Sequence, residues 1–304
     1  MTSVSTSAFY ERSSIDMASL RSRAESLQAE MGSGQRLTRG SDDPVAASRL
    51  RALARSESFN AIDATTTARA TTDLTLTDSA LSTFASYITR AQELATQAAN
   101  GTLTSAQQHS IGVELGQLQK ELVSLANSRD SMGHALFGGE TAGDAYSLDA
   151  AGTAAYVGTP SATELPLGDG QTVTSGLTGP EFLNFTAGGS STNLMAVIKG
   201  LSDALQGGST DPAQSARDAL GALDTGLETV TTAQTVVGAR LNWIDLVSER
   251  RTAQSELRAQ EQSDIGGTDI GATVSQLQQT LTVLEASQAS FTKLAGLTLF
   301  SMLR

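Results

Sequence analysis

The sequence predicts a mainly α-helical protein: a long antiparallel helical bundle with paired N- and C-terminal helices, plus a small β-rich inserted domain. Three observations lead to this fold class. Apolar residues recur at steps of three and four through residues 1 to about 136 and again from about 192 to 304. Residues 137 to about 190 are instead rich in Gly, Thr and Pro, with short alternating runs. Aromatic residues make up only 4% of the 304 residues, which favours helices packed lengthwise over a compact enzyme core.

The first helix is predicted by a narrow apolar stripe that stops at the break Gly32–Gly34. The stripe consists of Met17, Leu20, Ala24, Leu27 and Met31. Its spacing is typical of coiled-coil-like packing. Asp43 followed by Pro44 then predicts the start of a second helix, because Asp is a good N-cap and Pro suits the first helical position.

Two further stripes predict a helical hairpin. The first contains Leu74, Leu81, Phe84, Ile88, Ala91, Ala95 and Ala98, and the second contains Ile111, Leu115, Leu118, Leu122, Leu125 and Met132. Asn100-Gly101 between them is a helix stop and turn signal. Thr104 and Gln107 have the spacing of a capping box. We therefore expect two antiparallel helices joined near residues 99–104.

The Gly-rich segment predicts short strands rather than helix. Candidate strands lie at 135–137, 146–148, 154–157 and 171–174. Gly168-Asp169-Gly170 reads as a tight turn between two strands. We expect a small β-rich domain or a set of hairpins here.

The last third of the chain predicts two more helices. Asp211-Pro212 marks the start of one, and its stripe contains Leu220, Leu223, Leu227, Val230, Val237, Leu241 and Ile244. The segment Ser263–Asp269 interrupts the pattern. The final stripe contains Ile270, Val274, Leu277, Leu281, Leu284 and Phe291. The two breaks lie at comparable distances from the chain ends, which indicates a terminal module built from both ends.

These patterns predict three parts and one candidate interface. Residues 1–40 with 265–304 form a terminal helical assembly module, 41–136 with 191–264 a central helical bundle, and 137–190 a β-rich outer insert. A two-helix module buries little surface alone, so it either stays loose or packs against copies of itself. The predicted assembly interface comprises Met17, Leu20, Leu27, Met31, Ile270, Val274, Leu277, Leu281, Leu284, Phe291 and Leu294.

Composition argues against several classes of function. The net charge of −12 disfavours nucleic acid, because no basic face is available to neutralise phosphates. The chain has no cysteine, which excludes disulfides and thiol chemistry. No apolar stretch approaches the ~18 residues of a membrane span, so we expect no membrane insertion. The N-terminus lacks the pattern of a signal peptide, so we expect a cytoplasmic protein or one exported without a cleaved signal.

Signals for catalysis and metal binding are weak. Phosphate-loop, nucleophile-elbow and zinc-helix motifs are all missing from the sequence. His109 and His134 lie far apart and read as solvated residues at helix ends. Adjacent Asp42 and Asp43 read as helix-start residues rather than as a carboxylate pair, and Asp269 reads as a cap rather than a calcium ligand. We expect a non-enzyme with no catalytic residue, cofactor or metal.

Four parts of the sequence have the motifs of a known family: 34–49, which contains Asp42-Asp43-Pro44, then 91–103, 118–130 followed by Leu136-Phe-Gly-Gly139, and the apolar tail 297–304. Together they resemble the flagellar hook-associated protein 3 (FlgL) family of the flagellin superfamily. The match covers roughly 1–140 and 190–304. One departure is the segment Ala286–Phe291, where the family often has a Tyr-Gln-Ala stretch.

The resemblance implies a structural role at the hook–filament junction of the bacterial flagellum. Members of this family adapt the layer of hook-associated protein FlgK to the first flagellin subunits. By the resemblance, the subunits form a ring, their termini pair into an inner helical layer, and a cytoplasmic export chaperone guards the C-terminal stripe. The family is exported by the flagellar type III apparatus to an extracellular site and has no cleaved signal peptide.

Three alternatives remain open at this point. The chain could be a flagellin, the bulk filament subunit of the same superfamily. It could be a helical coiled-coil scaffold unrelated to flagella. An enzyme hidden in the insert is the third alternative, although the insert shows no nucleophile and base pattern.

Overall fold

The computed structural model describes residues 6–37, 39–130 and 132–302, and the chain divides into two compact units. A terminal unit contains residues 1–58 and 253–304, and a larger unit contains residues 59–252. Long helices dominate both units, and the strands form only two-stranded antiparallel sheets. The mainly α fold class with a small β-rich region is therefore confirmed. The expected division into three parts stays a prediction.

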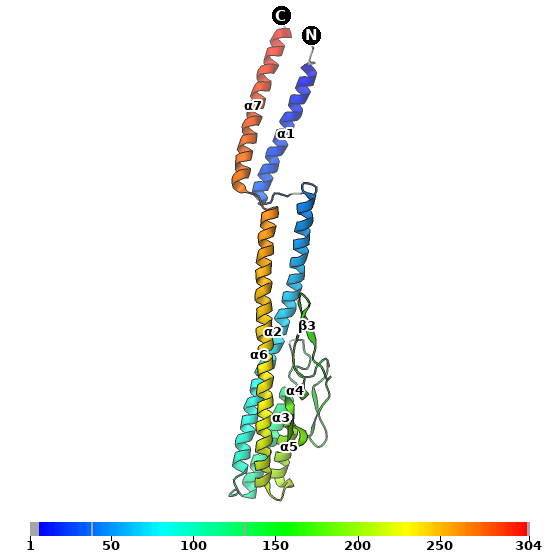
Figure 1. Cartoon of the computed structure of the whole chain (residues 1–304), viewed down its shortest axis with the longest axis vertical. Helices are drawn as coiled ribbons and strands as arrows, with labels where there is room; N and C mark the ends of the chain where they lie inside the picture. Colours follow the sequence, from blue (N-terminus) through cyan, green and yellow to red (C-terminus); the bar gives the residue numbers. More distant parts are fainter. Residues whose placement is uncertain (1–5, 38, 131, 303–304) are drawn as a thin grey trace. The chain divides into compact units, whose positions relative to one another are not determined.

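The terminal unit is built on two antiparallel helices. Helix α1 (Thr6–Ser33) packs along helix α7 (Ile270–Met302), as Figure 1 shows in blue and red. The unit also contains the first residues of α2 (Pro44–Ala98) and the last residues of α6 (Pro212–Gly266). The predicted cap of α2 is confirmed, because the Asp43 carboxylate accepts a hydrogen bond of 3.0 Å from the Ala46 amide.

The larger unit is a helical bundle around one hydrophobic core. Helix α3 (Ser105–Ala126) and the remaining parts of α2 and α6 supply most of this core, together with α5 (Leu194–Asp203) and the short π-helix η1 (Ala204–Gly208). The predicted stripe of α2 is fully buried: Leu74, Leu81, Phe84, Ile88, Ala91, Ala95 and Ala98. The capping box of Thr104 and Gln107 is confirmed at the start of α3. Burial of the stripe explains why a threonine-rich helix is stable here.

Two details of the hairpin differ from the prediction. Helix α3 ends at Ala126, six residues before Met132, the last residue of the predicted stripe. Met132 instead lies exposed in the turn that follows. The physical reason is local, because the Asp130 carboxylate accepts hydrogen bonds from the amides of Met132 and His134 and so stabilises a turn in place of a further helical turn.

The insert contains three β-hairpins and one short helix. Strands β1 (Tyr146–Leu148) and β2 (Ala154–Tyr156) pair, as do β3 (Glu164–Gly168) with β4 (Gln171–Thr174). Helix α4 (Gly179–Leu183) precedes the hairpin of β5 (Asn184–Ala187) and β6 (Ser190–Asn193). The predicted turn is confirmed: Gly168, Asp169 and Gly170 all have positive φ angles, a conformation that glycine adopts freely.

The predictions for the insert were partly wrong. The strands at 146–148 and 171–174 are confirmed with their predicted bounds, and that at 154–157 is one residue shorter. The strand expected at 135–137 does not form, since Ala135 makes only an isolated bridge with Arg129 and Phe137 turns into the core. Strands β3, β5 and β6 were not predicted, because Pro166 and the runs of Ser, Thr and Gly obscure any alternation.

The insert shares its core with the bundle. Phe84 of α2, Phe137 and Phe182 of α4 form an aromatic cluster with ring centroids 4.9–5.9 Å apart. Two arginines of α6 reinforce the contact: Arg240 donates to the Gly176 carbonyl at 2.6 Å, and Arg251 donates to the Leu167 carbonyl. Burial lowers the pKa of Arg240. The β-rich segment is therefore held to the bundle by both apolar and polar contacts.

Candidate assembly interface

The predicted interface residues lie along the two helices of the terminal unit. On the face where α1 and α7 pack together, Leu27 of α1 and Leu284 of α7 are buried. Thr273 and Thr280 of α7 are also buried, and the Thr280 hydroxyl donates to the Gln276 carbonyl of its own helix at 2.7 Å. A threonine satisfied in this way occupies an apolar seam without a desolvation penalty for its donor. The seam of the pair is therefore narrow and only partly aliphatic.

The remaining predicted residues divide into half-buried and exposed groups. Half-buried along the seam are Met17, Leu20, Met31, Val274, Leu277 and Phe291. Ile270, Leu281 and Leu294 are exposed, and so is Val283, which the sequence prediction did not include. One helical partner therefore covers only part of the apolar surface of α7.

An aromatic contact closes the seam at the free end of the pair. The rings of Tyr10 on α1 and Phe291 on α7 lie 5.3 Å apart at 88°, an edge-to-face arrangement. Phe9 packs edge-to-face on Tyr10 with centroids 6.1 Å apart and remains exposed itself. The predicted interface did not include Tyr10 and Phe9, because both residues precede the regular apolar stripe of α1. Side chains of the predicted tail 297–304 lie outside the described part of the structure.

A backbone clasp joins the two chain segments at the other end of the pair. Gln35 and Gly267 form an antiparallel bridge, in which the Arg36 amide donates to the Gly266 carbonyl at 2.8 Å. The Thr268 amide donates to the Gly34 carbonyl at 3.0 Å. We call these two hydrogen-bonded segments, 34–36 and 266–268, the clasp. The sequence indicated it only indirectly, through the matched positions of the two glycine breaks.

Ion pairs tie α2 to α6 within the same unit. The Arg49 guanidinium forms a two-pronged contact with the Glu261 carboxylate at 2.5 and 2.8 Å. This hydrogen bond raises the pKa of Arg49 and lowers the pKa of Glu261, so both groups stay charged. The Glu57 carboxylate forms a second ion pair with Arg258 at 3.5 Å and also accepts a hydrogen bond of 2.9 Å from Ser255. Because the pairs are exposed, they contribute to alignment more than to stability.

A metal site needs several acidic or histidine side chains close together. Across the described residues, no group of three His, Asp or Glu side chains is placed to hold a metal ion. Asp269 caps α7 by accepting a hydrogen bond of 3.0 Å from the Ala272 amide, which confirms the cap reading. None of the helices in the described ranges is long and apolar enough to cross a membrane.

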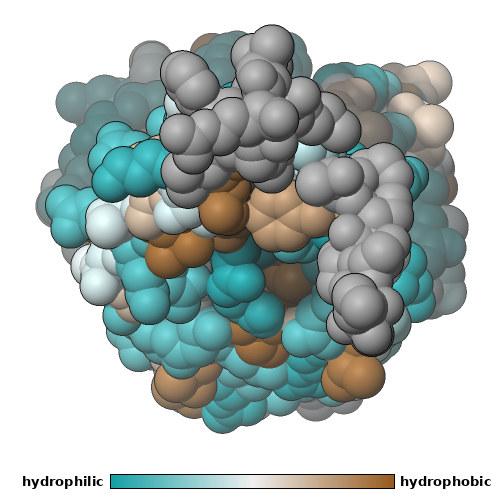
Figure 2. Space-filling model, turned by 90° about the horizontal axis from the view of Figure 1, so that it is seen from above, coloured by the Kyte–Doolittle hydropathy of each residue, from teal (hydrophilic) through white to brown (hydrophobic). Residues whose placement is uncertain are grey.

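The surface at one end of the molecule is mixed in character. Figure 2 shows hydrophobic residues in brown separated by hydrophilic residues in teal on the face that it displays. Scattered apolar side chains of this kind need a matching partner surface to become buried. The arrangement is compatible with a narrow helical contact.

Comparisons with known proteins agree on one group of relatives. The pattern described as the bacterial flagellin N-terminal helical region matches residues 4–142. Flagellar hook-associated protein 3 of Escherichia coli (strain K12) is 28% identical over 289 residues, which cover 90% of both chains. The structure of a putative flagellar hook-associated protein from Vibrio parahaemolyticus matches with a TM-score of 0.68 and 25% identity, covering 74% of this chain and 100% of that one.

A second solved structure supports the same fold. The flagellar junction protein FlgL from Legionella pneumophila matches with a TM-score of 0.59 and 14% identity, covering 71% of this chain and 99% of that one. The matched N-terminal pattern includes α1, the clasp residues 34–36 and the α2–α3 hairpin. The chain is therefore similar to flagellar hook-associated protein 3, FlgL, over 90% of its length, and its residues 4–142 match the N-terminal helical region of the flagellins.

Proposed function

We propose that this protein is a structural subunit of the bacterial flagellum that forms the hook–filament junction. One observation supports the proposal most directly. In a chain related to hook-associated protein 3, the apolar residues Ile270, Leu281 and Leu294 remain exposed on α7 although α1 already packs along that helix. Ile270 and Leu281 are eleven residues apart, about three helical turns, so they share one face of α7. An exposed apolar face of this kind is the mark of a surface that a further helix covers.

The physical role that we propose is mechanical. A junction subunit must bind an unlike partner on one side and flagellin on the other, so its two contact surfaces differ. Such a heterologous interface need not close on itself, so it can template continued growth. The clasp and the Arg49–Glu261 pair would hold the ends of the terminal helices in register while the interface forms.

The partners follow from this role. We propose the hook-associated protein FlgK below, flagellin above and like subunits in a ring. Before assembly, a cytoplasmic export chaperone would cover the apolar positions of α7, because they would otherwise promote aggregation. The protein would reach its extracellular site on the flagellum without a cleaved signal peptide. The interface would consist of the exposed and half-buried positions of α1 and α7 described above.

A non-enzymatic role is supported by the relatives, which are structural flagellar proteins by name. The remaining alternative is a flagellin, because residues 4–142 match a pattern that flagellins share. The two readings differ in where the protein is found. A flagellin extends along the whole filament, whereas a junction subunit occupies one short band.

A deletion strain tests the proposal. Electron microscopy of the strain should show intact hooks without filaments, with flagellin shed into the medium. Immunogold labelling of wild-type flagella should mark one short band beyond the hook. Label along the entire filament would refute the junction role and favour the flagellin reading instead.

A further inference from the structure

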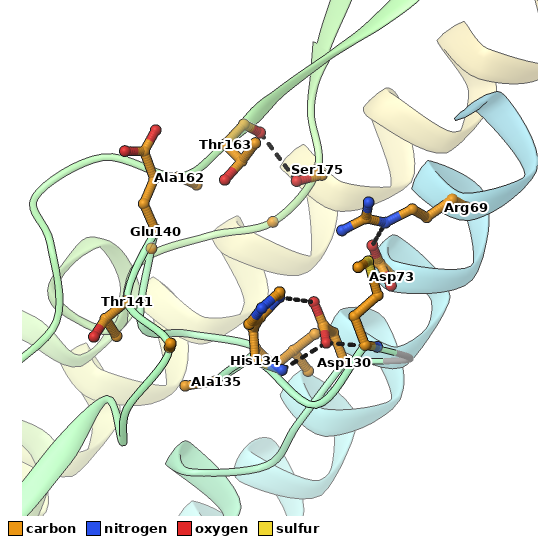
Figure 3. Close-up of a pocket in the computed structure, with 15 residues that line it drawn as sticks. Arg69, Asp73, Asp130, His134, Ala135, Glu140, Thr141, Ala162, Thr163 and Ser175 are labelled. Atoms are coloured by element: carbon orange, nitrogen blue, oxygen red, sulfur yellow. Dashed lines mark hydrogen bonds and ion pairs between the residues drawn. The ribbon is translucent and has the colours of Figure 1, made fainter. Parts of the chain in front are cut away.

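The larger unit contains a half-open cavity that the structural role does not use. It has a volume of about 390 Å³ and lies between α2, the turn after α3 and two segments of the insert (Figure 3). Its polar lining includes Arg69, Asp130, His134, Thr141, Thr163 and Ser175. Small-molecule sites have volumes from about 300 Å³ upward, so a molecule of monosaccharide size fits this space.

Two pairs of an acidic and a basic side chain in the cavity share the same layered arrangement. The Asp73 carboxylate and Arg69 Nε are 3.6 Å apart, with the Asp73 side chain 6% exposed and the Arg69 side chain 39% exposed. The Asp130 carboxylate and His134 Nδ1 are also 3.6 Å apart, with exposures of 14% and 46%. In both pairs the acid lies behind and the base lies toward the cavity. The groups that a ligand would meet first are therefore nitrogen donors.

The two acids are already engaged by the protein. The Asp130 carboxylate accepts hydrogen bonds of 2.8 Å from the amides of Met132 and His134, and Asp73 pairs with Arg69. Arg69 Nε is buried and makes no hydrogen bond, because its ion pair with Asp73 is too long for one. A buried donor without an acceptor is unfavourable, and its planar guanidinium is suited to a carboxylate ligand.

The opposite wall of the cavity presents hydroxyl groups. The Ser175 hydroxyl donates to the Thr163 carbonyl at 3.0 Å, which leaves its oxygen free to accept from a ligand hydroxyl. In Figure 3 the Arg69 guanidinium extends toward this side of the cavity, and the Glu140 carboxylate points away from Arg69. Glu140 therefore does not occupy the position where an anion would bind.

From this arrangement we propose that the cavity binds a small hydroxylated carboxylate, of the chemical class of sugar acids. The ligand carboxylate would bind the guanidinium of Arg69, with His134 beside it. The ligand hydroxyls would contact Ser175 and the neighbouring threonine side chains. The inference depends on the larger unit alone and is independent of the proposed junction role.

The test uses the full-length protein and two matched sugars. D-glucuronate is titrated against the protein, with D-glucose as the neutral analogue, and the ring resonances of His134 are followed by NMR. We expect saturable shifts with glucuronate and none with glucose. Arg69→Gln should weaken glucuronate binding about tenfold or more, because a charge-assisted contact is lost. Arg250→Gln, an exposed arginine on α6 outside the cavity, should leave binding unchanged.

Three outcomes would overturn the proposal. Glucose and glucuronate could bind equally, which would show that no carboxylate is recognised. Arg250→Gln could weaken binding as much as Arg69→Gln, which would show general attraction of anions. Glucuronate could give no saturable shift at all. Should Arg69→Gln fail to fold, Ser175→Ala provides the second variant, and unchanged glucuronate binding in it would refute the assigned hydroxyl wall.

Discussion

Replacing Leu281 with Asp tests the assembly interface without disturbing the free chain. The Leu281 side chain is 39% exposed, whereas Leu284, one turn of α7 away, is 9% exposed against α1. Full burial of a leucine is worth about 1.5–3 kcal/mol, so the uncovered part of Leu281 offers roughly 1 kcal/mol to a partner helix. A carboxylate at that position would instead be buried without a counter-charge in the assembly, at a cost of several kcal/mol.

The expected result is a folded protein that fails to assemble. The thermal unfolding of Leu281→Asp should be close to that of the wild type, because the site is partly hydrated in the free chain. Incorporation should fall at least a hundredfold, since each 1.4 kcal/mol changes an equilibrium constant tenfold. The assay is restoration of motility in the deletion strain, with binding to purified hooks as the direct measurement.

Leu284→Asp is the matched control. It places the charge on the seam between α1 and α7, so it should already separate the two helices in the free chain, as seen by faster amide exchange in α1. Normal motility with Leu281→Asp would refute the argument, because α7 could then carry a charge at an exposed apolar position and still assemble.

Three further substitutions examine the larger unit. Phe182→Ala should lower the free energy of unfolding by about 3–5 kcal/mol, measured by urea denaturation, because it empties a fully buried site in the aromatic cluster. Gly112→Ala should cost about 1–3 kcal/mol in the same assay, since its added carbon would lie 3.0 Å from the Ser202 carbonyl oxygen on α5; an unchanged midpoint would contradict that close approach. Tyr146→Phe should be neutral or stabilising at pH 7, because the buried hydroxyl has no hydrogen-bond partner. Burial raises the pKa of Tyr146, so the wild type should lose stability relative to the variant as the pH rises above about 10, where the unfolded tyrosine ionises.

Local signals predicted most helix boundaries correctly. Asp43, Asp211 and Thr104 each cap a helix where the sequence placed one, because a cap involves only residues three or four positions apart. The long stripes were equally informative. Leu81 and Phe84 are fully buried because a stripe extending over many turns defines one face of a helix.

Contacts between distant segments could not be predicted in this way. The cavity is lined by both Arg69 of α2 and His134 of the turn after α3, and no sequence pattern groups the histidine with a residue of another element. His134 was read as a solvated helix-end residue, whereas it lies in a turn and pairs with Asp130. The exposure of Ile270 and Leu281 could not be predicted either, because an apolar stripe does not indicate how much of its surface a partner helix covers.

The clasp has a consequence for the order in which the protein folds. The Arg36 side chain bonds to the Ile265 carbonyl across a separation of 229 residues, and the helix pair beyond it depends on the same long-range closure. Closing so long a loop costs conformational entropy before any contact is gained, and contacts of high sequence separation form slowly. The α2–α3 hairpin, whose turn spans only a few residues, can form as soon as both of its helices have been synthesised. Helix α1, although first in the chain, must therefore wait for α7, and the terminal unit is the last to become ordered.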